Sequence, residues 1–132
     1  MSYGQQAEAY LSTGILSSAP DQLIPILYEH LLVSLKQAQK RIETGDMEGK
    51  ALSVIRAREI VHELLASLDM EAGGELSSRL ASLYLFFSKE IASASRELDA
   101  PRLGPIIDMV GALHESWVKA VASLAGSEAQ GA

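Results

Sequence analysis

Glutamate and histidine are the residue types whose spacing in this chain could support chemistry, and Glu59 and His62 form the most suggestive pair. A Glu-x-x-His spacing places both side chains on neighbouring helix positions, and two such pairs with two further glutamates hold a di-iron centre in some four-helix bundles. Neither His30 nor His114 has a glutamate three residues earlier, so the second pair is missing. We therefore interpret Glu59 and His62 as residues of a solvated face.

The other histidine patterns also fall short of a catalytic site. His62 and His114 are each followed by glutamate, as in the zinc-protease pattern His-Glu-x-x-His, but Ala66 and Val118 occupy the place of the second histidine. No nucleophile, base and orienting group can be combined from the sequence. The sequence predicts no enzyme, no metal site and no bound cofactor.

Two adjacent glycines, Gly73 and Gly74, separate two apolar helical patterns. A phosphate-binding loop would need a preceding strand and a lysine, and the pattern has neither. Paired glycines instead end a helix, because each costs about 1 kcal/mol relative to Ala and supplies the positive φ of a C-terminal cap. Glu75 and Ser77 suit the first turn of the next helix. The pattern predicts a structural corner at Gly73 and Gly74, across which two helices turn back antiparallel.

Composition excludes several classes of function. The 132 residues include 11 Lys and Arg against 17 Asp and Glu, which gives a net charge of −6 and no cationic surface for a phosphate backbone. Nucleic acid is therefore not an expected partner. Cysteine is absent, which fits a reducing compartment. No basic and apolar leader opens the chain, and no apolar run approaches the roughly 18 residues of a membrane span. We expect a soluble cytoplasmic protein without membrane insertion.

Apolar spacing predicts four helices. The first starts after Ser18 and ends near Glu43, and the second is capped by Asp46 and runs to about Leu68. The third follows the glycine corner, and the fourth starts at residues 99–101. Their core stripes contain Ile24, Leu27, Tyr28, Leu31, Leu35, Ala38 and Ile42; Val54, Ala57, Val61, Leu64, Leu65 and Leu68; Leu76, Leu80, Leu83, Tyr84, Phe87, Ile91, Ala94 and Leu98; and Leu103, Ile106, Val110, Leu113, Trp117, Val121 and Leu124.

Short links between these helices predict an all-α fold, an antiparallel up-down-up-down four-helix bundle over residues 18–125. Residues 1–17 are rich in Gly, Ser and Gln with scattered apolar residues, which is typical of a mobile N-terminal arm. Residues 126–132 have nothing to pack, so we expect a disordered tail.

Several large apolar residues fall outside the core stripes when each residue advances the helix by about 100°. These outer residues are Ile26, Val33, Leu52, Ile55, Leu85 and Phe86. A single exposed apolar residue is normal and can cover the edge of a core. Several exposed apolar residues on each helix are more than a small soluble monomer usually leaves uncovered. An amphipathic helix is the natural partner for such a surface. We predict that the outer residues bind another protein.

Four blocks of sequence resemble the flagellar secretion chaperone family FliS. The most specific is Leu68-Asp69-Met70-Glu71-Ala72-Gly73-Gly74-Glu75, which is close to the family's corner between its second and third helices. Tyr10, Ile15 and Ala19-Pro20 resemble its N-terminal pattern. Leu83-Tyr84 with Phe86-Phe87 is similar to its Leu-Tyr-x-Tyr-Met segment, and Ser116-Trp117-Val118-Lys119 to its closing Ala-Trp-Lys. The resemblance covers roughly Tyr10 to Lys119.

The resemblance implies a cytosolic chaperone that binds the C-terminal helical segment of flagellin, prevents its polymerisation and keeps it competent for type III export. Other flagellar export or regulatory proteins are further partners that it leaves open. The competing interpretation is a helical-bundle dimer with a structural or regulatory role, whose outer residues meet in a symmetric interface. We call the surface between the outer residues the groove. We also expect Tyr10 and Ile15 of the N-terminal arm to lie in part of this groove until the client displaces them.

Overall fold

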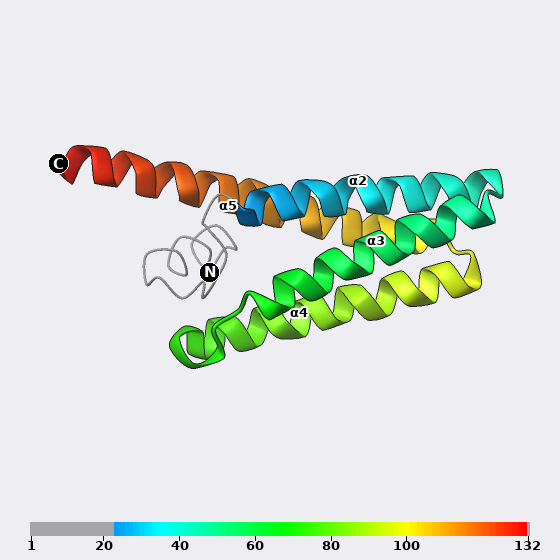
Figure 1. Ribbon diagram of the computed structural model, residues 1–132, viewed down its shortest axis with the longest axis horizontal. Coiled ribbons are helices and arrows are strands. Elements are labelled where there is room, and N and C mark those ends of the chain that lie inside the picture. Colours follow the sequence, from blue (N-terminus) through cyan, green and yellow to red (C-terminus); the bar gives the residue numbers. More distant parts are fainter. Residues whose placement is uncertain (1–22, 132) are drawn as a thin grey trace.

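The computed structural model describes the backbone of residues 23–131 and the side chains of residues 23–123. Over this range the chain forms α2 (Leu23–Thr44), α3 (Met47–Ala66), α4 (Met70–Glu97), the 3-10 turn η1 (Pro101–Leu103) and α5 (Gly104–Gly131). Consecutive helices run in opposite directions (Figure 1), with α3 packed on both α2 and α4 and with α5 packed on α2. The expected up-down-up-down four-helix bundle is confirmed.

The corner between α2 and α3 follows directly from its residue types. Gly45 adopts a φ of 77°, the left-handed conformation that glycine accepts without strain. Asp46 then caps α3, because its carboxylate accepts a 2.9 Å hydrogen bond from the Gly49 amide. A Cβ on Gly49 would lie 2.3 Å from Oδ2 of Asp46, so this cap requires glycine at the third position of the helix. The predicted cap at Asp46 is present.

The corner between α3 and α4 differs from the prediction in its details. Helix α3 ends at Ala66, and Asp69 caps α4 by accepting 3.1 and 3.0 Å hydrogen bonds from the amides of Glu71 and Ala72. The chain therefore turns before the two glycines, within the span 67–69. Gly73 is helical, and Gly74 alone has a positive φ (51°, with ψ −127°), which breaks α4 after its first turn. The carboxylate of Asp69 marks the start of α4 better than the glycines do, because it satisfies two free amides of the first turn.

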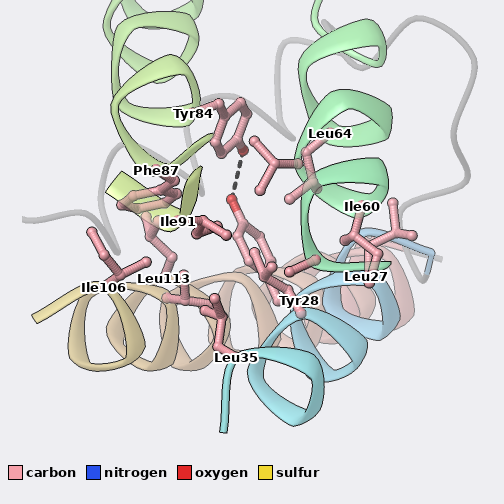
Figure 2. Close-up of a cluster of buried hydrophobic side chains, with 14 of the residues drawn as sticks. Leu27, Tyr28, Leu35, Ile60, Leu64, Tyr84, Phe87, Ile91, Ile106 and Leu113 are labelled. Carbon is pink, nitrogen blue, oxygen red and sulfur yellow. Dashed lines mark hydrogen bonds between the residues drawn. The ribbon is translucent and has the colours of Figure 1, made fainter. Parts of the chain in front are cut away.

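The core is built from one stripe on each helix, much as the apolar spacing predicts. Side chains from α2, α3, α4 and α5 converge on one centre in Figure 2, among them Leu35, Ile60, Phe87 and Leu113. The hydroxyl groups of Tyr28 and Tyr84 share a buried 2.6 Å hydrogen bond between α2 and α4. Such a bond favours one register, because displacing either helix would separate two buried polar groups.

The structure differs from the prediction at the C-terminal ends of α4 and α5. Leu98 was expected in the core, but it ends α4 in a left-handed conformation (φ 55°) and its side chain is 49% exposed. That prediction was wrong because the α-helical spacing no longer applies beyond Glu97. At the other end, α5 is helical as far as Gly131, although residues 126–132 were expected to be a disordered tail. Whether these last turns fray in solution stays a prediction.

Candidate interaction surface

All six outer residues have exposed side chains, with exposed fractions from 42% at Phe86 to 63% at Leu52. The helical phasing that separated them from the core is therefore correct. Adjacent residues on α3 make the contrast clear, since Val54 is buried and Ile55 is not. These large side chains do not fill the core, and together they expose the kind of apolar surface that another molecule can cover.

Three outer residues lie along the side where α2 and α3 meet. Arg41 of α2 donates a hydrogen bond to Oγ of Ser53 on α3, which identifies the side that each helix turns to the other. At about 100° per residue, Leu52 on α3 leans to that side, and so do Ile26 and Val33 on α2. These three residues share the outer side of the α2 and α3 pair but are spread along it, because Arg41 lies beside Ser53 and Leu52 is therefore near the end of α2 whereas Ile26 is near its start.

Two further outer residues lie on the side where α3 and α4 meet. Nε of Arg58 on α3 donates a 3.3 Å hydrogen bond to Oγ of Ser88 on α4, and this bond identifies the facing sides. Ile55 precedes Arg58 by three residues and Leu85 precedes Ser88 by three residues, so both lean to the same side as the bond. Because α3 and α4 run antiparallel, these two steps go in opposite directions along the bundle, so Ile55 and Leu85 share one outer face but are separated along it.

Phe86 stands apart from the other five outer residues. It lies about 100° around α4 from Leu85, on the side of Glu90, which is held by Arg102 of η1. Its ring centroid is 6.3 Å from that of Phe87, the buried neighbour in sequence. The outer residues therefore do not make one continuous strip. They are spread over the outer sides of α2, α3 and α4, and a single short helix could not cover all of them.

The structure also exposes apolar residues that the outer set omitted. These residues are Met47, Met70, Leu98, Met109 and Val118. The signal for Met109 and Val118 was present in the sequence, because the apolar stripe of α5 spans about half of its circumference. Met47 and Met70 each open a helix immediately after its cap, where spacing alone does not define a buried side. Tyr10 and Ile15, the expected gate, lie outside the described residues.

The residues considered for metal chemistry do not form a site in the described part of the chain. Glu59 and His62 are both exposed, and the Glu59 carboxylate lies 3.8 Å from the guanidinium of Arg56. Nε2 of His114 lies 3.5 Å from Oε1 of Glu29 and makes no hydrogen bond. Within residues 23–123, no group of three or more His, Asp or Glu is placed to hold a metal ion.

An ion-pair network closes the link between α4 and α5. Nε of Arg102 lies 2.5 Å from Oε2 of Glu90, and Nη1 of Arg102 lies 2.8 Å from Oε2 of Glu97. The hydrogen bond from Arg102 holds the pKa of the Glu90 carboxyl below its ordinary value, against the opposing effect of partial burial. The same bond raises the pKa of Arg102. These ion pairs hold η1 against α4, and they keep the carboxylates of Glu90 and Glu97 on the side of α4 that faces η1.

This four-helix bundle carries several large apolar side chains on its outside, a feature typical of surfaces that contact other proteins. Among the described residues, no helix is both long and apolar enough to cross a membrane.

Comparison with known proteins gives the family. Residues 3–124 match the family model of the flagellar protein FliS. The flagellar secretion chaperone FliS of Campylobacter jejuni is 32% identical over 99 residues, which is 75% of this chain and 77% of that protein. The protein of the same name from Salmonella typhimurium is 28% identical over 84% of this chain and 83% of its own length. The one from Bacillus subtilis is 27% identical over 87% of this chain and 85% of its own length. The chain belongs to the FliS family, as its corner and aromatic blocks predicted.

Proposed function

We propose that this flagellar export chaperone binds the C-terminal amphipathic helical segment of flagellin in the cytosol. Binding there prevents premature polymerisation and keeps the segment competent for type III secretion. The observation that carries the proposal is the set of six outer residues, all exposed and all outside the core. Family membership supplies the flagellar context, and the exposed apolar groups supply the physical means.

The physical argument concerns what an export client lacks before assembly. A segment that forms amphipathic helices only when packed cannot bury its apolar face alone, so it remains unfolded or associates with other copies. A bundle with exposed apolar residues on α2, α3 and α4 can cover such helices in place of sister subunits. Because these residues lie on different sides of the bundle, we expect more than one helical segment of the client to contact the chaperone.

Titration calorimetry with a peptide of the flagellin C-terminal segment tests the proposal. We expect saturable one-to-one binding with a negative heat-capacity change, the signature of apolar burial. The solution mass should be that of a monomer without peptide and of a one-to-one complex with it. A stable dimer that ignores the peptide would contradict the proposal and favour the alternative, a bundle whose outer residues meet in a symmetric interface.

The N-terminal arm belongs to the same proposal. We propose that Tyr10 and Ile15 occupy part of the groove in the client-free state and that the client helix displaces them. A self-docked arm lowers the apparent affinity, because the intrinsic affinity is multiplied by the fraction of molecules that are open. Deleting residues 2–16 should therefore increase the binding of an apolar reporter dye and tighten client binding. Unchanged dye binding and affinity would show that the arm does not act as a gate, and weaker client binding would identify it as a clamp.

A further inference from the structure

The outer face formed by α3 and α4 combines apolar and cationic side chains in a regular way. Residues at alternating spacings of four and three share one face of a helix. On α3 this spacing connects Ala51, Ile55, Arg58, His62 and Leu65, and on α4 it connects Leu85, Lys89, Ala92 and Arg96. We call these two stripes together the cationic face. They lie side by side because α3 and α4 pack antiparallel (Figure 1) and the Arg58 to Ser88 bond joins them.

Every charged residue of the cationic face is basic, although the whole chain carries a net charge of −6. Arg58, Lys89 and Arg96 have exposed side chains, and none of them forms an ion pair within the described residues. Arg58 bonds to the hydroxyl of Ser88, and Arg96 to that of Ser93. Lys50, beside the face, donates to the carbonyl of Ser95. The hydrogen-bond partners of Arg58, Arg96 and Lys50 are neutral, and Lys89 interacts with the Glu90 carboxylate only as a minor cause of its lowered pKa. The face therefore keeps a net positive charge.

The nearest carboxylates are engaged away from this face. Glu59 of α3 follows Ile55 by four residues, but its carboxylate lies beside Arg56, which is on the side of α3 toward α2. Glu90 of α4 follows Lys89 in sequence but is bound to Arg102 on the other side of the helix. The strip between Ile55 and Leu85 therefore carries only basic charges, while Glu59 lies beside Ile55 on its far side, away from α4.

We propose that the cationic face receives a helical segment of the flagellin client that carries carboxylates on both flanks of its apolar positions. Ile55 and Leu85 contact the apolar positions of this helix, while Arg58, Lys89 and Arg96 pair with its Asp and Glu side chains. Charge complementarity selects this occupant, because a neutral or basic helix would leave the cations desolvated without partners. The inference rests on the proposed function and adds the chemistry of one client segment to it.

The test compares two double variants that each remove two positive charges. Lys89→Gln with Arg96→Gln removes two of the three positive charges of the cationic face and keeps the bond from Arg58 to Ser88 between α3 and α4. Lys36→Gln with Lys40→Gln is the matched control, because both lysines are exposed on α2 away from this face. The probe is the flagellin C-terminal peptide, used once with its own sequence and once with Asp and Glu changed to Asn and Gln. Thermal unfolding of each variant checks that the bundle is intact.

At an ionic strength of about 0.01 M, the Lys89 and Arg96 variant should bind the native peptide at least about tenfold more weakly than the control variant. The difference should shrink at about 1 M, where charges are screened beyond roughly 3 Å. The neutralised peptide should bind both variants alike. Equal affinity of both variants for the native peptide at low salt would overturn the inference and leave the proposed function intact. Absence of binding to the unchanged protein would overturn both.

Discussion

Phe86 and Phe87 are adjacent and chemically identical, yet α4 places them in opposite surroundings. The Phe87 side chain is fully buried among side chains of several helices, as Figure 2 shows, whereas 42% of Phe86 is exposed. Phe87 contributes to the core together with Ile91 and Leu113, and Phe86 adds little to it. The comparison indicates that one helix serves two purposes, with the inner stripe holding the bundle together and the outer residues left for binding.

The largest effect should come from truncating the inner aromatic residue. Phe87→Ala removes a fully buried ring and leaves a cavity, which should lower the free energy of unfolding by about 3 to 5 kcal/mol. Phe86→Ala, the matched control, should change it by less than about 1 kcal/mol because surface substitutions have small effects. Denaturant unfolding of both variants measures the difference. Similar losses in the two variants would mean that the two sides of α4 are not distinct.

A smaller effect is expected at the glycine pair of the corner. Gly74 has a φ of 51° and a ψ of −127°, which an L side chain adopts only with strain, so Gly74→Ala should cost about 1 to 3 kcal/mol. Gly73 is helical, and Gly73→Ala should be neutral or slightly stabilising. Peptide binding should be retained in both variants. A fully stable Gly74→Ala variant that no longer binds flagellin would move this corner into the binding surface.

Acid should weaken the link between α4 and α5 before it affects the apolar core. The pKa of Glu90 is lowered in the folded protein, chiefly by its hydrogen bond to Arg102. A carboxyl with a depressed pKa stabilises the fold above its unfolded pKa of about 4.3, and that contribution is lost as pH falls through the folded value. Glu90→Gln should therefore lower the thermal midpoint near neutral pH and reduce its decline in acid. An unchanged acid profile would show that the pair contributes nothing measurable.

Apolar spacing predicted most of the fold because a bundle helix repeats one simple pattern. The stripes from Ile24 to Ile42 and from Leu103 to Trp117 are buried as expected, and the Asp46 cap is in place. Prediction failed at the α3 to α4 corner, where the glycines gave a stronger local signal than Asp69. The positions of glycines in a sequence do not reveal which of them will have a positive φ, since that depends on how the corner packs.

The outer surface could be predicted only in part. Helical phase was sufficient to identify residues such as Ile55 and Leu85 as exposed. It could not show that they share one outer face of the bundle, because that depends on the rotation of α3 against α4. The cationic face was missed for the same reason, since Arg58 and Lys89 come together only when the two helices pack.

The central claim, that the outer residues bind the client without supporting the fold, is tested most directly by adding charge to them. Phe86→Asp and Ile55→Asp should each weaken the affinity for the flagellin C-terminal peptide by more than about 1.4 kcal/mol, or tenfold, in titration calorimetry. The thermal midpoint of each variant should stay close to that of the unchanged protein. Unfolding of both variants, or unchanged peptide affinity in both, would contradict the account.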